Sequence, residues 1–411
     1  LERAVHLAQA HTLQAHETEL IGALHTTFTQ GILAAVPQWE AMIPKYYATQ
    51  PDVLAFASIM LRQIVRTDEE SESVKVMLEA ALELHPDHIG LGHYYTHVME
   101  VREDFVDGKV VAERMATLAP NAPHLTHMPG HIYFLEGDYA KTIQTFEGAR
   151  RQEEGYHART GIPYNANQNY FHNLHYLAVA YSEMGEKDKA LEAAQRYANL
   201  SLRQATPLDG NALMILYEGR ILPALVHLRF REYDAAAKHL AFWLQHPSLA
   251  TDHPLVRAYL STLQTYCKGM AAIEQGDPAL AQRHYEQMDQ LIHDYERQAL
   301  TIPQNAEFEL VNQVYDQMSL ARLQLRGWLD NLDPAQTFDS TAWDEALALE
   351  QLLPYDEPPR LMYPVGESLL HLQLWRGDPQ AVEAAAKLAL AYRPNSPIIQ
   401  RALSHEINNK L

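Results

Sequence analysis

Three short histidine-rich segments carry residues whose types and spacing suit transition-metal chemistry. The first segment reads His93-Tyr-Tyr-Thr-His97-Val-Met-Glu100. Because a helix returns to the same face after three or four residues, His93, His97 and Glu100 are expected to point the same way. Two imidazoles and one carboxylate form a three-ligand set for zinc, iron or copper. The alternative is a surface helix that carries two incidental histidines.

The second segment contains three histidines around a Pro-Gly pair, at His124, His127 and His131. Proline is tolerated in the first turn of a helix but is costly in its interior. The position of Pro129 therefore predicts a helix that begins near Met128 or is kinked there. His127 would then lie near the helix start and His131 one turn further on, with His124 on the lead-in. A histidine-rich loop between helices is the alternative.

The third segment places His172 and His175 on either side of Asn173 and Leu174. Residues three apart share a helix face, so the two imidazoles are expected to lie together. Asn173 points elsewhere, where it can orient a substrate or a metal ligand. The alternative is a pair of histidines on a core helix rich in aromatic residues.

The elements that must position these segments are helices in series. Strand signals are almost absent, and apolar residues recur at three- and four-residue spacing. Glycines at 137, 185, 276 and 377 each end one helical pattern and begin another within about two residues. The sequence around Arg231 looks like a copy of this turn without the glycine. The pattern predicts an all-α array of helix–turn–helix pairs.

These pairs resemble the tetratricopeptide-repeat (TPR) family, since Gly137-Asp-Tyr-Ala140 and Phe146 match the glycine, tyrosine, alanine and aromatic positions of its unit. The resemblance implies a superhelical solenoid with a concave pocket, although the repeat step is longer than the family's. The three histidine segments also resemble a largely uncharacterised group of bacterial TPR proteins with HYxxHxxE, HMPxH and HNxH motifs. That group carries a late Tyr-Pro-Val-x-Glu motif, here Tyr363–Glu367, and implies no settled reaction.

The sequence predicts a single α-solenoid over residues 1–411. Histidine-rich metal-site repeats are expected at 85–205, and a C-terminal repeat and cap at 341–411. Clusters of Pro, Asp, Ser and Thr predict connecting loops at Thr206–Asn211, Gln245–His253 and Asp330–Ser340. Near the last repeat, Arg360 or Glu367 is either a substrate contact or part of a helix cap and an ion pair.

Equivalent helices of a solenoid lie side by side on its inner surface, so the three segments are expected to converge in the concave pocket. Glu100 is either a ligand or a general base, Tyr95 belongs to a tyrosine-rich wall, and Asn173 orients a neighbour. These three are the predicted catalytic residues. The predicted ligands of one or two metal ions are His93, His97, Glu100, His124, His127, His131, His172 and His175.

A histidine-dominated ligand set suits copper, iron or zinc rather than magnesium or calcium. We therefore expect a metal-dependent oxidative enzyme, with copper or iron preferred, acting on a small molecule or peptide in the groove. Two alternatives stay open. One is a TPR interaction scaffold with a structural metal, and the other is a zinc-dependent hydrolase, although the His-Glu-x-x-His motif of zinc proteases is absent.

Composition narrows the remaining function classes. The single cysteine excludes a disulfide or a Cys-based zinc site within the chain, and the net charge of −20 argues against nucleic-acid partners. No apolar run approaches the length of a membrane span. The sequence thus predicts a cytoplasmic protein with no membrane association. It makes no prediction of the oligomeric state. It begins at Leu1 rather than Met, so we expect that an N-terminal piece has been removed or left out.

Overall fold

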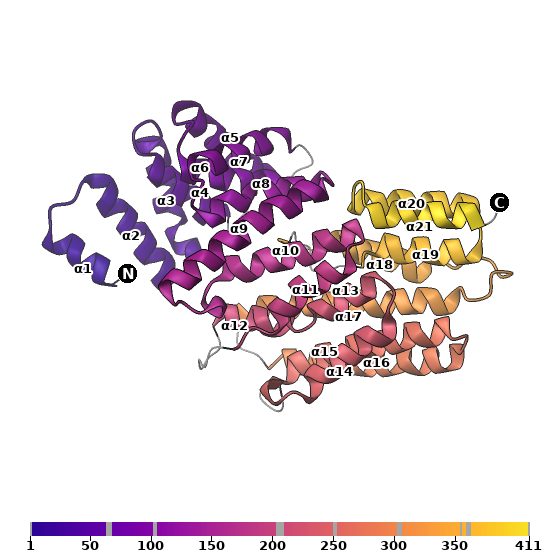
Figure 1. Ribbon diagram of the computed structural model, residues 1–411. Helices are drawn as coiled ribbons and strands as arrows, with labels where there is room; N and C mark the ends of the chain where they lie inside the picture. The colour runs from indigo at the N-terminus through magenta and orange to yellow at the C-terminus, as the bar shows by residue number, and fades with distance from the viewer. Residues whose placement is uncertain are drawn as a thin grey trace. The chain divides into compact units, whose positions relative to one another are not determined.

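A computed structural model describes residues 2–62, 68–101, 105–202, 209–249, 253–301, 306–353, 356–358 and 363–409. Over these ranges the regular structure is helical and contains no strand (Figure 1). Helices that follow one another in sequence pack against one another. The predicted all-α array of helix pairs is therefore confirmed. The chain divides into two compact units, unit 1 at Leu1–Tyr133 and unit 2 at Phe134–Leu411.

Unit 1 is built from successive helices that surround two small apolar cores. One core gathers around Trp39 and Met42, and the other around Leu78, Leu91 and Tyr95. The helices are α1 (Glu2–Ala10), α2 (Ala15–Gln30), α3 (Ile32–Tyr46), α4 (Pro51–Arg62), α5 (Asp68–Leu84), α6 (Ile89–Glu100), α7 (Val106–Leu118) and α8 (Pro123–Leu135), whose last residues enter unit 2.

Helices α6 and α7 approach closely because each presents a glycine to the other. A Cβ on Gly92 of α6 would lie 2.6 Å from Sδ of Met115, and a Cβ on Gly108 of α7 would lie 2.6 Å from Cβ of Met99. Real side chains do not approach so closely, so a larger residue at Gly108 would force the two helices apart, whereas one at Gly92 would have to displace the flexible end of Met115. This contact holds in place the helix that carries the first histidine segment.

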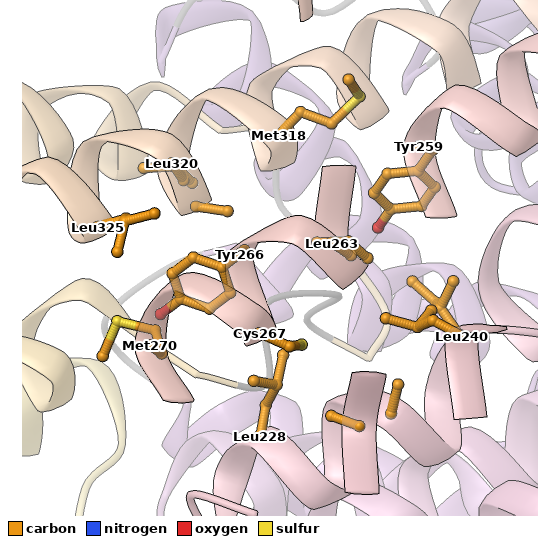
Figure 2. Close-up of a cluster of buried hydrophobic side chains, with 14 of the residues drawn as sticks. Leu228, Leu240, Tyr259, Leu263, Tyr266, Cys267, Met270, Met318, Leu320 and Leu325 are labelled. Atoms are coloured by element: carbon orange, nitrogen blue, oxygen red, sulfur yellow. The ribbon is translucent and has the colours of Figure 1, made fainter. Parts of the chain in front are cut away.

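Unit 2 continues the same pattern of paired helices. It contains α9 (Tyr139–Thr160), η1 (Tyr164–Ala166), α10 (Gln168–Met184), α11 (Lys187–Ala198), α12 (Gly210–Met214), η2 (Ile215–Gly219), α13 (Leu222–Arg229), α14 (Tyr233–Gln245), η3 (Pro247–Leu249), α15 (Pro254–Glu274), α16 (Pro278–Ala299), α17 (Ala306–Asp330), α18 (Thr341–Leu352), α19 (Val365–Arg376), α20 (Pro379–Tyr392) and α21 (Pro397–Asn409). Figure 2 shows part of its apolar core, where Cys267 lies among Leu228, Leu263 and Met270. Burial raises the pKa of the Cys267 thiol, which makes it unreactive.

The predicted turns lie where the glycine pattern put them. Gly137, Gly185, Gly276 and Gly377 have φ of 75°, 75°, 73° and 81°, the left-handed conformation that favours glycine. Arg231 adopts the same conformation with φ 58°, so the turn that lacks a glycine keeps its geometry. The long step from 276 to 377 is filled by the pair α17 and α18, joined through the predicted loop at Asp330–Ser340. Of the other two predicted loops, residues 203–208 and 250–252 lie outside the described residues.

Replacing two of these glycines by alanine is expected to separate backbone strain from crowding. At Gly276 nothing lies within 4 Å of an added Cβ, so Gly276→Ala should cost only the left-handed penalty of about 1–2 kcal/mol. At Gly137 the same Cβ would collide with the carbonyl oxygen of Pro394. Gly137→Ala should therefore cost about 1–3 kcal/mol more. Urea unfolding midpoints measure the difference, and equal midpoints would contradict the contact.

The end of unit 2 returns to its beginning. The hydroxyl of Tyr139 donates to the carbonyl of Pro394 at 2.9 Å, and Nδ2 of Asn395 donates to the carbonyl of Glu136 at 3.1 Å. Helix α21 also packs against α10, and Arg401 donates to the carbonyl of Met184. The array of unit 2 is thus closed on itself, which the sequence pattern of serial pairs did not predict.

A buried ion-pair network lies at this closure, and its four charged side chains are each at most 2% exposed. Arg229 of α13 donates to Glu183 of α10 at 2.7 Å and also to Glu367 of α19. Arg393, beyond α20, donates through Nε to the second oxygen of Glu183 at 3.0 Å. Burial opposes the ionisation of Glu183, but Arg229 and Arg393 together hold its pKa below the ordinary value. Ser396 donates to the same carboxylate at 2.6 Å.

This network decides between the two interpretations of Glu367. Its carboxylate is 1% exposed and paired with Arg229, so it forms the intramolecular ion pair rather than a surface contact for substrate. Arg360, the other residue considered there, lies outside the described residues. The predicted division of the array into a metal-site region and a C-terminal cap stays a prediction.

Candidate metal centre

Five imidazoles of unit 1 form a closed circuit between α6 and α8. The ring centroids lie 4.8 Å apart for His93 and His97, and 4.6 Å apart for His93 and His124. From His124 the circuit continues to His127 at 4.9 Å and from there to His131 at 5.1 Å. His131 closes it with a 5.8 Å distance to His97. The first and second predicted segments therefore come together.

Three of the five imidazoles aim one nitrogen each at a common point. Nε2 of His93 lies 3.0 Å from Nε2 of His97 and 3.0 Å from Nε2 of His124. The three side chains form a group whose ligand atoms all lie within 4.8 Å of one another and which can hold a metal ion. Two nitrogens on one tetrahedral ion, bonded at about 2.0–2.1 Å, lie about 3.3–3.4 Å apart. Small rotations of the rings would bring these nitrogens to that spacing.

The three Nε2 atoms can bind one metal ion better than they can hydrogen-bond to one another. Each ring nitrogen has one in-plane direction, which carries either a proton or a lone pair. Nε2 of His93 can therefore make only one good hydrogen bond, yet two other Nε2 atoms lie at 3.0 Å from it. A metal ion between the three nitrogens accepts a lone pair from each of them at once.

Glu100 is placed to hold two of the rings rather than to reach the common point. Its side chain is fully buried, and its oxygens lie 3.1 Å from Nδ1 of His97 and 3.2 Å from Nδ1 of His131. A carboxylate that accepts from Nδ1–H fixes the tautomer in which Nε2 has a free lone pair. In His97 that lone pair is directed at the three-nitrogen group.

Helix α8 corrects the expected start of the second segment. It begins at Pro123 and contains Pro129 in its interior, so the prediction of a start near Met128 was wrong. A proline at the first helical position loses no hydrogen bond, because the N–H there has no partner within the helix. Its fixed φ also suits the helix, so Pro123 favours the earlier start. His124 consequently lies in the first turn of the helix, one turn before His127 and two turns before His131. All three then share the face that α8 turns toward the imidazoles of α6.

Tyr95 and Tyr94 have different surroundings, although they are neighbours in sequence. Tyr95 is buried in the core of unit 1, where its hydroxyl donates to Glu79 of α5 at 3.0 Å. Tyr94 instead stacks on the His93 ring, with centroids 4.9 Å apart, and burial raises its pKa. Sequence reasoning counted Tyr94 among the tyrosines around the motifs but gave it no separate role. Its position directly after a predicted ligand was the available signal. A catalytic role for Tyr95 stays a prediction.

The third segment lies on α10 of unit 2. The ring of His172 packs against Tyr176 and Phe146, and Asn173 is fully buried. His175 is 3% exposed, and its Nδ1 lies 3.8 Å from the carboxylate of Glu218 in η2. Sequence reasoning missed Glu218, because no pattern links it to α10. The convergence of His172 and His175 on the imidazoles of unit 1, and the orienting role of Asn173, stay predictions.

Comparisons with known proteins add little to this description. No family model matches the chain, and no curated protein matches it. Among solved structures, one titled "Structure of Naa15/Naa10 bound to HypK-THB" is similar at 12% identity, with a TM-score of 0.32. The similarity covers 93% of this chain and 59% of that one, and it is too weak to support any conclusion. The resemblance to the bacterial TPR group therefore stays a prediction.

The helices of the described residues were also compared with the requirements of a bilayer. None of them is both long enough and apolar enough to cross a membrane.

Proposed function

We propose that this chain is a transition-metal enzyme on a helical-repeat scaffold, with its ion held by His93, His97 and His124. The observation that carries the proposal is the approach of three Nε2 atoms from two helices to within 4.8 Å of one another. Three protein ligands leave a fourth position for water or substrate, which is typical of catalytic rather than structural sites.

The accessibility of the site supports the same view. His93, His97 and His124 are partly exposed, whereas His127 and His131 are each 1% exposed. The three-nitrogen group is thus at the open end of the imidazole circuit. An open coordination position there can be reached by a small molecule or a peptide side chain.

The ligand set favours copper over iron. Non-haem iron enzymes commonly bind their ion through two histidines and one carboxylate. Here, however, both oxygens of Glu100 lie beside imidazole Nδ1 atoms. Three neutral imidazoles suit copper, and also zinc. A bound copper ion would take electrons from the substrate and pass them to dioxygen. The protein side chains would position the ion and shield one side of it.

Metal analysis of the whole protein tests this proposal. After purification without added metal, and again after loading with copper, iron or zinc in turn, bound metal is measured by mass spectrometry. We expect about one tightly bound equivalent, and a stabilisation of about 2.7 kcal/mol when free metal reaches 100 times its Kd. Less than about a tenth of an equivalent, together with no thermal shift for any of the three ions, would overturn the proposal.

Oxygen uptake separates the proposed chemistry from hydrolysis. A copper-loaded protein that consumes dioxygen with added reducing substrates supports an oxidative enzyme. Activity that requires zinc and is the same with and without oxygen would favour the hydrolase instead, because zinc has no redox chemistry.

The orienting role of Glu100 makes a graded prediction. Glu100→Gln replaces one carboxylate oxygen with an amide nitrogen and removes the negative charge that lies beside Nδ1 of His97 and of His131. Loss of such a carboxylate typically lowers metal affinity by about 10–100-fold. Glu79→Gln is the matched control, since Glu79 lies on α5, outside the helices that carry the imidazole circuit, and accepts from the Tyr95 hydroxyl. Competition with a chelator of known affinity measures both variants, and equal affinities would refute the role.

The contribution of α10 is tested in the same assay. If His172 and His175 belong to a second site, the fully loaded protein should bind a further equivalent of metal, and replacing both histidines with alanine should remove that equivalent alone. Unchanged stoichiometry would restrict the centre to the imidazoles of unit 1.

A further inference from the structure

Three buried tyrosines of unit 2 gather where the Tyr363–Glu367 motif leads into α19. Tyr233 begins α14, Tyr266 lies on α15, and Tyr363 stands two residues before α19. Each of the three is at most 4% exposed. The proposed metal centre uses none of them, so the tyrosine of the motif is left without a role there.

The hydroxyl groups of these tyrosines approach one another without pairing. Burial raises the pKa of Tyr363, and the nearby hydroxyls of Tyr233 and Ser368 partly oppose that rise. Burial also raises the pKa of Tyr266, which has Ser368 beside it in the same way. These contacts fall short of hydrogen-bond geometry, and none of the three phenol oxygens has a hydrogen-bond partner in the described part of the chain. Neighbouring hydroxyls that do not bond to each other are placed to donate together to a third group.

Ser368 adds a fourth hydroxyl to this tyrosine cluster. It lies on α19 and is fully buried, and its Oγ accepts from Nε1 of Trp328 at 3.2 Å. A hydroxyl that accepts in this way keeps its own proton for another acceptor. Buried donors in folded proteins are rarely left without an acceptor, so the four hydroxyls together define a position for a bound acceptor.

Two arginines give the tyrosine cluster a positive potential. Burial opposes the charge of Arg231, but the neighbouring hydroxyls of Tyr363 and Tyr233 raise its pKa. Burial and the charges of Arg231 and Arg229 also lower the pKa of His371 to about 3. The imidazole of His371 stacks on the Tyr363 ring with centroids 6.3 Å apart, and it is neutral. The tyrosine hydroxyls are therefore close to two fixed cations and to a ring that adds no charge.

Donors outnumber acceptors around these hydroxyls. Two carboxylates border the tyrosine cluster, and both are paired. Glu274 accepts from Arg231 at 2.9 Å, and Oε1 of Glu367 is paired with Arg229. Among the described buried atoms, the three phenol groups and Nε of both arginines are donors without an acceptor, whereas Oε2 of Glu367 is an acceptor without a donor. This balance favours a ligand that accepts several hydrogen bonds and carries negative charge.

From this arrangement we infer that unit 2 binds a halide ion between the hydroxyls of Tyr233, Tyr266 and Tyr363, beside Arg231. A halide accepts several hydrogen bonds at once and is close to water in size, which suits hydroxyls that already lie side by side. The net charge of −20 opposes anions at long range, so the affinity must come from these local donors. The inference goes beyond the metal centre, because it uses a different unit and requires no metal.

Thermal unfolding of the whole protein, without added metal, tests the inference. Melting temperatures are compared in sodium chloride, sodium bromide and sodium gluconate at constant ionic strength. A ligand that binds only the folded state stabilises it. Chloride and bromide should therefore raise the melting temperature in a saturable way when they replace gluconate. An unchanged or lower melting temperature in both halide salts would overturn the inference.

The variant Tyr363→Phe separates a ligand contact from a structural one. In gluconate it should be at least as stable as wild type, because it removes a buried hydroxyl that has no partner. In chloride it should be less stable than wild type, with halide affinity at least about tenfold weaker, since hydrogen bonds to a charged partner are the stronger ones. Tyr156→Phe, at an exposed tyrosine of α9, is the matched control and should respond to chloride as wild type does. A wild-type chloride response in Tyr363→Phe, or the same loss of stability in both salts, would refute the assignment.

Bromide locates the site without any variant. In crystals of the wild-type protein soaked in sodium bromide, anomalous scattering should show an ion within hydrogen-bond distance of the three phenol oxygens. Bromide found only at the protein surface, or no bromide at all, would contradict the inference even if Tyr363→Phe failed to fold.

Discussion

Replacing His93 with alanine is expected to abolish tight metal binding. His93 is the centre of the three-nitrogen group, because its Nε2 lies 3.0 Å from the corresponding atoms of both His97 and His124. Its removal leaves two ligands that no longer share a neighbour. The loss should exceed the effect of an orienting carboxylate, which is about 10–100-fold. Chelator competition measures the affinity, and mass spectrometry measures the metal retained after gel filtration.

Two controls distinguish a lost ligand from a damaged fold. His293→Ala removes an exposed histidine of α16, whose side chain is 63% exposed, and should retain the wild-type metal content. Added imidazole should occupy the space left in His93→Ala and restore part of the binding. A His93→Ala protein that binds metal as tightly as wild type would rule out the proposed centre.

The largest expected effect on stability belongs to Arg229. Replacing it with methionine leaves Glu367 buried without its arginine and leaves Glu183 with Arg393 alone. Removing one partner of a buried ion pair costs about 3–5 kcal/mol, because the carboxylate left behind, here Glu367, is poorly hydrated and has lost its counter-charge. Arg229→Met should therefore unfold at markedly lower urea concentration than wild type, as followed by far-ultraviolet circular dichroism.

An exposed arginine provides the matched comparison. Arg151 pairs with Glu147 at 3.1 Å, but its side chain is 63% exposed. Solvent screens such pairs, so Arg151→Met should change stability by no more than about 1 kcal/mol. If the two variants had the same urea midpoint, the network would not stabilise the closure of unit 2.

Local sequence patterns predicted the helical array well because the forces that define it are local. The left-handed turns at Gly137 and Gly377 follow from the backbone freedom of glycine, and the stripe of apolar residues defines each buried face. Arg231 extends this success, since the sequence around it was identified as a copy of the same turn without the glycine, and Arg231 adopts the left-handed conformation. The closure of unit 2 escaped prediction because it joins residues such as Glu183 and Arg393, 210 positions apart. No periodicity records such a pairing.

In the candidate site, too, local spacing could be predicted from the sequence, whereas the contacts of each side chain could not. Helical spacing brought His93, His97 and Glu100 to one face, but it left two roles for the carboxylate. The distances from its oxygens to two Nδ1 atoms suit an orienting group, and the choice between ligand and general base stays a prediction. Similarly, the cost of an interior proline at Pro129 predicted a late helix start, whereas Pro123 at the first helical position favours the earlier start that the structure has. The π-helical turn η2 (Ile215–Gly219), which carries Glu218, has no recognisable sequence signal. For this reason the sequence could not pair Glu218 with His175.

The closure of unit 2 also determines the order in which the protein can mature during synthesis. Arg229 leaves the ribosome 164 residues before Arg393, an interval on the order of ten to thirty seconds. Until then Glu183 lacks one of its two arginines, and the part of α10 that α21 covers stays exposed. All five imidazoles of the circuit precede residue 134, in a unit with its own apolar cores. The histidines of the proposed metal centre are thus all synthesised while the second half of the chain is still incomplete.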